Sequence, residues 1–269
     1  MRATPFEERP MPRLAANLGY LFVERPLLDR FAAAAACGFN AVELTFPYSE
    51  PADAVRREIE RHQLKILGIN TPLGAAGEPG VAGIPGREHD FDSMFRRALD
   101  YAITIGAGSI HCMSGQVPPA QQADGKRVFA ANIARAADLA AERGLTILLE
   151  PINRRDRPDY LLHRPEQAAA VIDEVGRPNV RIQFDFYHVQ IEGGDLMTRF
   201  ARYHPVVGHV QIAAVPSRAE PDEGEVNYAA ILNMLDHSGY DGFVACEYKP
   251  RKRTEDGLGW AKPYGVGAG

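Results

Sequence analysis

The chain has 269 residues, of which 45% are hydrophobic and 24% are charged, values close to the averages for soluble globular proteins. This length and composition exclude a fibre, a coiled coil and a disordered chain, and they predict a large buried core. The 30 Lys and Arg residues against 35 acidic ones give a formal net charge of −5, so the chain lacks the basic surface that a nucleic-acid-binding protein needs.

The cysteines and the apolar runs bear on where the protein works. Cys37, Cys112 and Cys246 form no CxxC pair, which predicts neither a disulfide framework nor a thiolate metal site. No apolar run approaches the roughly 20 residues that span a bilayer, and residues 1–12 lack the apolar segment of a signal peptide. We therefore expect a cytoplasmic protein that binds neither nucleic acid nor membrane.

Short apolar or β-branched runs alternate with longer amphipathic stretches along the whole chain. The short runs predict eight strands, at residues 14–17, 41–46, 65–70, 109–113, 146–150, 181–185, 207–212 and 243–247. The amphipathic stretches predict helices at 27–37, 52–62, 91–105, 127–143, 165–175, 195–203 and 227–238, with a weaker helical segment after Glu255.

Alternating strands and helices form right-handed parallel crossovers. Eight such units without a linker predict a single (β/α)₈ TIM barrel domain over residues 1–269. An open doubly wound sheet is the alternative. The first turn from strand to helix carries no GxGxxG or Walker pattern, so a nucleotide site has no support.

A glycine-rich segment follows the third predicted strand. Gly74, Gly77, Gly80, Gly83 and Gly86 recur every third residue, but five triplets are too few for a collagen helix. We expect a long, flexible loop on the barrel face where loops build active sites. The sequence leaves open whether this loop is a lid or a surface excursion.

Active sites of TIM barrels lie at the carboxyl ends of the strands, so the last polar residue of each strand is informative. The fifth, sixth and eighth predicted strands end at Glu150, Asp185 and Glu247, and the seventh carries Gln211. One acidic residue at a strand end is usually a turn residue or a helix cap, but four oxygen donors in succession would repel each other without a cation. Oxygen ligands favour Mg²⁺ or Mn²⁺ over Zn²⁺.

Further motifs are spread over nearly the whole chain. In chain order they are Ala15-Ala16-Asn17-Leu18, Val42-Glu43-Leu44, Phe46-Pro47-Tyr48, Ile84-Pro85-Gly86-Arg87-Glu88, Glu150-Pro151-Ile152-Asn153, Asp185-Phe186-Tyr187-His188, His209-Val210-Gln211-Ile212-Ala213, Gly224-Glu225-Val226-Asn227-Tyr228 and Cys246-Glu247-Tyr248-Lys249-Pro250. Together they resemble the hydroxypyruvate isomerase family of xylose isomerase-like TIM barrels. The related 2-oxo-tetronate isomerases share most of these motifs.

The resemblance implies metal ligands at Glu150, Asp185, Gln211 and Glu247, and a catalytic pair in Glu150 and Glu247. It implies an isomerase that interconverts hydroxypyruvate and tartronate semialdehyde through an enediolate, with the two glutamates as acid and base in turn. The motifs do not separate this activity from that of a 2-oxo-tetronate isomerase or a related sugar 3-epimerase, and both stay open as alternatives.

A small hydroxy-keto acid substrate needs a cationic partner for its carboxylate. Arg218, Arg87 and Lys249 are the candidates, and Arg218 comes first because it follows the seventh predicted strand directly. His188 lies three residues after Asp185, and the resemblance implies that its ring contacts a substrate oxygen. We therefore expect these four side chains to bind substrate.

Two other functional classes use barrels of this type. A metal-dependent nuclease would need a basic groove and a histidine-rich zinc site, whereas we expect His111 and His209 to be packed strand residues. A non-catalytic ligand-binding barrel would lack Glu150 or Glu247, and both are present. Barrels of this size often associate, so a homo-oligomer is compatible with the sequence, although no face identifies itself as an interface.

Overall fold

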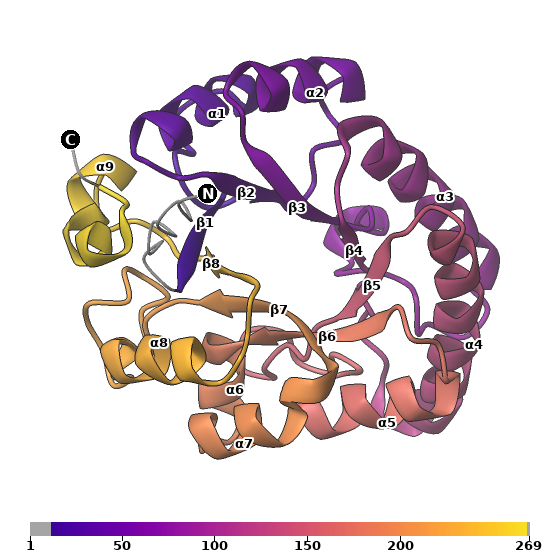
Figure 1. The fold of residues 1–269 in the computed structure, drawn as a ribbon. Coiled ribbons are helices and arrows are strands. Elements are labelled where there is room, and N and C mark those ends of the chain that lie inside the picture. Colours follow the sequence, from indigo (N-terminus) through magenta and orange to yellow (C-terminus); the bar gives the residue numbers. More distant parts are fainter. Residues whose placement is uncertain (1–11, 268–269) are drawn as a thin grey trace, which may run out of the picture.

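The computed structural model describes residues 12–267, which form a closed barrel of eight parallel strands in sequence order. In Figure 1 the strands form the inner ring and the helices surround it. The strands are β1 (Arg13–Asn17), β2 (Ala41–Leu44), β3 (Lys65–Asn70), β4 (Ser109–His111), β5 (Thr146–Leu149), β6 (Val180–Asp185), β7 (Val207–Ile212) and β8 (Phe243–Cys246). The predicted TIM barrel is therefore confirmed.

Helices connect successive strands and cover the outside of the barrel. The α-helices are α1 (Leu27–Ala36), α2 (Ala52–Arg61), α3 (Glu88–Ile105), α4 (Gln122–Ala141), α5 (Pro165–Val175), α6 (Phe186–Glu192), α7 (Leu196–Tyr203), α8 (Tyr228–His237) and α9 (Thr254–Gly257). The 3₁₀ helices are η1 (Ala75–Gly77), η2 (Pro119–Gln121), η3 (His204–Val206) and η4 (Leu258–Tyr264). Within residues 12–267, no helix has the length and apolar character needed to cross a membrane.

The helix α6 is not expected from the sequence pattern. Its residues Phe186, Tyr187, His188 and Val189 are all buried, so the segment has no polar face and no amphipathic period. The Asp185 side chain caps this helix by accepting a hydrogen bond from the Tyr187 backbone N–H at 2.8 Å. The cap fixes the point where β6 ends and thereby the orientation of Asp185.

The glycine-rich segment follows β3 as predicted, and Gly77 lines a cavity at the carboxyl ends of the strands, but one part of the segment is packed against the rest of the protein. Residues 79–83 are buried. The Gly83 backbone N–H donates to the Ser114 carbonyl at 2.7 Å, and the Asn132 side chain donates to the Ala82 carbonyl at 2.7 Å. The small residues allow the backbone to pack closely against the loop that follows β4, so this part of the segment is anchored.

Aromatic packing fixes α6 against the barrel. Phe184 of β6, Phe186 of α6 and Phe200 of α7 are fully buried, and their ring centroids lie 5.0, 5.5 and 5.8 Å apart. These distances are typical of stabilising aromatic contacts. The cluster therefore holds the helix that carries His188.

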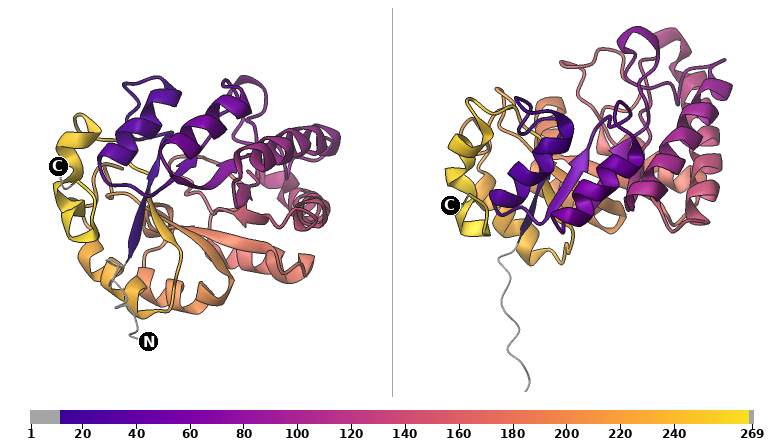
Figure 2. Two further views of the ribbon diagram at one scale, coloured as in Figure 1. Left: turned by 45° about the horizontal axis from the view of Figure 1, so that its top comes forward. Right: turned by 90° about the horizontal axis from the view of Figure 1, so that it is seen from above.

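Parallel pairing places residues of neighbouring strands at the same height in the barrel. Asn17 of β1 pairs with Glu43 of β2, and Asp185 of β6 pairs with Gln211 of β7. The side view in Figure 2 shows the loops after β3 and β5 projecting from one end of the barrel. Polar strand-end residues therefore gather at this end.

Candidate active site

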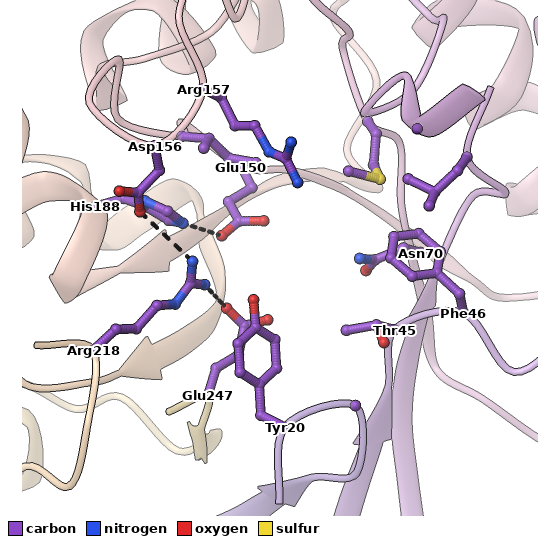
Figure 3. A pocket seen from close by; sticks show the side chains of 15 residues that line it. Tyr20, Thr45, Phe46, Asn70, Glu150, Asp156, Arg157, His188, Arg218 and Glu247 are labelled. Atoms are coloured by element: carbon purple, nitrogen blue, oxygen red, sulfur yellow. Dashed lines mark hydrogen bonds and ion pairs between the residues drawn. The ribbon is translucent and has the colours of Figure 1, made fainter. Parts of the chain in front are cut away.

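A cavity of about 500 Å³ opens at the carboxyl ends of the strands (Figure 3). One wall is largely apolar and is formed by residues after β2, β3 and β4, which include Phe46, Leu73 and Met113. The opposite wall is polar and comes from the second half of the barrel. Its side chains are Glu150, Asp156, Arg157, His188, Arg218 and Glu247.

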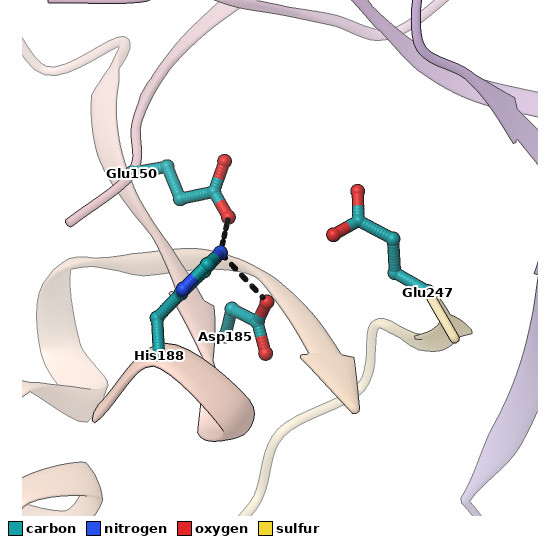
Figure 4. Close-up of side chains that lie close together, drawn as sticks. All are labelled: Glu150, Asp185, His188 and Glu247. Carbon is teal, nitrogen blue, oxygen red and sulfur yellow. Dashed lines mark ion pairs between the residues drawn. The ribbon is translucent and has the colours of Figure 1, made fainter. Parts of the chain in front are cut away.

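Three carboxylates and one imidazole converge at the polar wall. Glu150 follows β5, Asp185 ends β6, Glu247 follows β8 and His188 lies in the first turn of α6. Each offers one potential ligand atom, these atoms lie within 4.8 Å of one another, and all four residues are buried. In Figure 4, Glu150 and Glu247 approach the cluster from opposite sides.

Burial disfavours the charged forms of the three carboxyl groups, and their protein neighbours compensate only in part. Burial, together with repulsion from the other two carboxylates, raises the pKa of Glu150 well above its usual value. Burial also raises the pKa of Glu247 to about 8 and that of Asp185 to about 6, although Arg218 opposes both shifts. Within residues 12–267, Glu150 Oε1 and Asp185 Oδ2 accept no hydrogen bond.

These properties fit a divalent cation. A cation favours the charged form of nearby carboxylates and gives the unpartnered oxygens a ligand. Three carboxylate donors suit a hard ion such as Mg²⁺ or Mn²⁺ better than a soft one. The residues that would hold it are Glu150, Asp185 and Glu247.

The two ring nitrogens of His188 have different surroundings. Nδ1 faces two donors of Asn153, the side-chain Nδ2 at 2.6 Å and the backbone N–H at 3.4 Å, so Nδ1 accepts. Burial and Arg218 lower the pKa of His188 well below its usual value, which makes the ring neutral with its proton on Nε2. Nε2 lies 3.5 Å from Asp185 Oδ2 and 3.7 Å from Glu150 Oε1. In this tautomer His188 presents a proton donor to the two carboxylates, and its Nε2 has no lone pair to offer a cation.

Gln211 lies beside the carboxylates with its amide nitrogen toward them. Nε2 donates to Glu247 Oε1 at 3.2 Å and to Glu43 Oε1 at 2.7 Å. The amide oxygen of Gln211 accepts from Gln183 Nε2 at 2.8 Å. The amide would have to turn over to become the expected oxygen ligand, and this turn would break the bond to Glu43. Gln211 as a metal ligand stays a prediction.

Glu43 of β2 is another buried acid, and the sequence pattern does not reveal its role. Its Oε2 lies 2.6 Å from His209 Nε2, and Asn17 Nδ2 donates to its Oε1 at 2.7 Å. Although burial raises the pKa of Glu43, attraction to His209 and hydrogen bonds from two amides bring it below its usual value. Asn17 also donates to Glu247 Oε1 at 3.0 Å, so Asn17 and Gln211 both bridge Glu43 to Glu247.

Arg218 lies in the loop between β7 and α8 with a positive φ of 56°. Its Nη2 donates to Glu247 Oε2 at 2.5 Å, and its Nη1 lies 3.7 Å from Asp156. The guanidinium carbon lies 4.9 Å from the Tyr20 ring centroid and 4.8 Å from that of Tyr187, so the two rings enclose it. Arg218 thus lies in the cavity wall, but its charge is directed at Glu247.

Arg87 and Lys249 are not among the residues that line the cavity. Arg87 precedes α3 and forms ion pairs with Glu78 and Asp90. The Lys249 side chain is exposed, and only its backbone N–H contacts the site region, by donating to the Arg218 carbonyl at 2.7 Å. Both residues lie next to a site motif in the sequence, but neither side chain reaches the cavity.

The sequence pattern also missed Tyr20, Asp156 and Arg157, which line the cavity from the loops after β1 and β5. A usable signal existed for the second loop, because residues 153–157 form a polar run that begins three residues after Glu150. Loops that follow strands are where TIM barrels carry substrate-binding residues. No comparable signal marks Tyr20.

Comparison with known sequences agrees with the family resemblance of the motifs. The sequence model of the xylose isomerase-like TIM barrel family matches residues 31–264. The chain is 48% identical to a 2-oxo-tetronate isomerase of Cupriavidus necator over 94% of this chain and 99% of that protein. It is 39% identical to the hydroxypyruvate isomerase of Escherichia coli K12 over 94% of this chain and 100% of that protein.

Solved structures show the same fold. A crystal structure of a protein from Brucella melitensis, named AP endonuclease, family 2, has a TM-score of 0.92 and 44% identity, and the match covers 94% of this chain and 99% of that one. A 3-keto-D-glucoside 4-epimerase from E. coli has a TM-score of 0.81 at 21% identity, with 93% of this chain and 98% of that chain covered. The second likeness concerns the fold alone.

We expect Mg²⁺ or Mn²⁺ to raise the melting temperature of the EDTA-treated protein, because a ligand that binds only the folded state stabilises it by about 2.7 kcal/mol at 100 times its Kd. Asp185→Asn should retain the cap of α6, since Asn is also a good N-cap residue, but lose most of the metal-dependent shift. Differential scanning fluorimetry measures both effects. Asp138→Asn, an exposed control, should keep the full shift. An equal shift in both variants would contradict the metal site.

Glu43→Ala should lower the free energy of unfolding by about 3–5 kcal/mol, because it leaves the buried His209 ring without its acceptor and removes one of the two acceptors of the Asn17 and Gln211 amides. Urea denaturation followed by circular dichroism measures the change. Exposed Glu142→Ala is the control and should change stability by less than about 0.5 kcal/mol. Equal stability of the two variants would show that the Glu43 network contributes little.

Proposed function

The chain belongs to the xylose isomerase-like TIM barrel family, and we propose on this basis that it is a divalent-metal-dependent isomerase of short hydroxy-oxo acids. The observation that carries the proposal is the pair of buried glutamates, Glu150 and Glu247, on opposite sides of a cluster suited to a cation. Relatives named as isomerases, at 39% and 48% identity over nearly the whole chain, support the reaction class.

Two substrates fit this proposal. Hydroxypyruvate, with tartronate semialdehyde as the product, is the substrate of the family that the motifs resemble, but the motifs are shared with 2-oxo-tetronate isomerases. The higher identity to a 2-oxo-tetronate isomerase favours 2-oxo-tetronate. Both are 2-oxo-3-hydroxy acids, and they differ in whether C3 carries a second hydrogen or a hydroxymethyl group. A cavity of about 500 Å³ accommodates either acid. The same chemistry therefore serves both.

The reaction moves the carbonyl group from C2 to C3 of the substrate. A proton leaves C3, another is added to C2, and the hydroxyl proton passes from O3 to O2, with an enediolate as the intermediate. One carboxylate takes the C3 proton while a protonated carboxyl group delivers the C2 proton, so a facing pair such as Glu150 and Glu247 serves both directions. A bound Mg²⁺ or Mn²⁺ would polarise the carbonyl group and acidify the adjacent C–H.

Neighbouring side chains orient Glu247, one member of this pair. Arg218 binds Glu247 Oε2, while Asn17 and Gln211 donate to Glu247 Oε1, so both oxygens of this carboxylate are held in place. The Nε2 proton of His188 faces the cluster and is available to a substrate oxygen. We assign Arg218, Asn17 and Gln211 to positioning Glu247. We assign His188 to contacting the substrate.

Two other activities on this type of barrel have less support. A sugar 3-epimerase would act on neutral ketoses, and the solved 3-epimerases match at only 16–22% identity, which concerns the fold alone. The similar protein from Brucella melitensis is named an endonuclease. The net charge of −5 and a cluster with a single histidine among the described residues favour the isomerase instead.

We expect the EDTA-treated protein supplied with Mn²⁺ to turn over hydroxypyruvate, 2-oxo-tetronate or both, and not D-psicose, a neutral ketose. Measurement of kcat/KM for the three compounds side by side identifies the substrate. Conversion of D-psicose without conversion of either acid would favour the epimerase. Full activity in EDTA would remove the metal from the proposal.

Glu150→Gln and Glu247→Gln should each lower kcat by at least about 100-fold, the usual effect of losing a general acid or base, because the amide keeps the shape but cannot transfer the proton. Steady-state kinetics on the preferred acid measure the loss, and circular dichroism checks the fold. Glu60→Gln on α2, which is exposed, is the control and should retain kcat. A variant with wild-type kcat would exclude its residue from the catalytic pair.

A further inference from the structure

One cationic side chain in the cavity has no assigned partner. Arg157 lines the cavity from the loop between β5 and α5, and in Figure 3 its guanidinium group points into the space beside Glu150. Among residues 12–267, no acidic side chain forms an ion pair with Arg157, and no hydrogen bond involves its guanidinium group. Its charge is therefore available to a ligand.

Other arginines near the cavity are already engaged. Arg218 binds Glu247 at 2.5 Å and is enclosed by two tyrosine rings. Arg154 forms an ion pair with Glu192 at 2.5 Å. Arg155 donates to the Tyr187 hydroxyl at 3.4 Å. A substrate carboxylate that approached Arg218 would compete with Glu247 for the same guanidinium group, whereas Arg157 offers its donors without such competition.

The backbone around Arg157 is fixed although its side chain is exposed. The Arg157 N–H donates to the Asn153 carbonyl at 3.1 Å, and the Arg157 carbonyl accepts from the Tyr160 N–H at 3.2 Å. Tyr160 is fully buried and its hydroxyl accepts from the Ser114 N–H at 3.1 Å, which anchors this loop to the loop after β4. An arginine on an anchored backbone holds a carboxylate with a smaller loss of conformational entropy.

We propose that Arg157 binds the carboxylate of the substrate and so selects acids over neutral sugars. The inference rests on the proposed function. If the C2 and C3 oxygens of the substrate bind at the carboxylate cluster, its carboxylate carbon, C1, is directed toward Arg157. An acid would otherwise be repelled by Glu150, Asp185 and Glu247. A guanidinium group beside the cluster compensates for this repulsion and orients the substrate for transfer at C2 and C3.

The test compares wild type with Arg157→Gln, Arg157→Lys and the exposed control Arg127→Gln on α4, which changes the net charge equally. Two readouts are used. One is KM and kcat for the preferred acid, and the other is the Kd of glycerate by calorimetry, since glycerate carries the carboxylate and hydroxyl groups of the substrate class but cannot isomerise. Circular dichroism verifies that each variant is folded.

Arg157→Gln should raise both KM and the glycerate Kd by about 10- to 100-fold, as expected for a lost charge-assisted hydrogen bond, with a smaller effect on kcat. Arg157→Lys should recover part of the affinity because it keeps the charge but not the planar fork, and Arg127→Gln should match wild type. Unchanged KM and Kd in Arg157→Gln, or no glycerate binding by wild type, would overturn the inference.

The two proposals fail in different ways. If wild type converts neither acid but binds glycerate through Arg157, the isomerase proposal fails while Arg157 remains a carboxylate-binding residue. If wild type converts an acid and Arg157→Gln behaves as wild type, the isomerase proposal stands and the role of Arg157 is refuted. Each result is read from the same set of proteins.

Discussion

Mutual repulsion among Glu150, Asp185 and Glu247 is the constraint to which the surrounding structure responds. Their ligand atoms lie within 4.8 Å of one another in a buried setting, where water cannot screen the charges. A closed barrel holds such groups together because each sits at the end of a strand that is paired on both sides. Arg218 and the N-terminal cap of α6 reduce the repulsion but do not remove it, as the raised pKa values show.

A neighbouring acid shows the opposite behaviour. Glu43 is as deeply buried as Glu150, yet its pKa is lowered because His209, Asn17 and Gln211 supply the charge and the donors it needs. Glu150 has an oxygen that accepts no hydrogen bond within the described part of the chain. The chain therefore satisfies Glu43 with its own residues, whereas Glu150 and Asp185 each keep an oxygen without a hydrogen-bond donor among the described residues. This contrast distinguishes the two acidic centres although both are buried.

Much of this arrangement could be predicted from the sequence. The eight strands are short apolar runs, and barrel geometry then places Glu150, Asp185 and Glu247 together without knowledge of any distance. The sequence pattern failed for segments whose conformation depends on tertiary packing. The first four residues of helix α6 are all buried, so this helix has no amphipathic period to detect. The glycines between residues 79 and 83 allow close packing of the backbone, but glycines are also typical of flexible loops, so the sequence alone does not distinguish the two.

The direction in which a side chain points was the other feature that the sequence did not predict. Arg87 and Arg157 are both arginines in loops after strands, and only the folded chain shows that the first pairs with Glu78 and Asp90 while the second reaches the cavity. The amide orientation of Gln211 depends on Gln183 and Glu43, two contacts that no linear spacing reveals. Strand positions follow from local periodicity, whereas the partners of a charged side chain depend on long-range contacts.

The two unlike walls of the cavity come from different halves of the barrel. The carboxyl groups of Glu150 and Glu247 come from the ends of β5 and β8, while Phe46, Leu73 and Met113 come from the segments after β2, β3 and β4. Replacements in the first half of the barrel can therefore enlarge or narrow the space for a substituent while the buried carboxyl groups keep their geometry. The size of a bound molecule and the charge that faces it are thus set by separate parts of the chain.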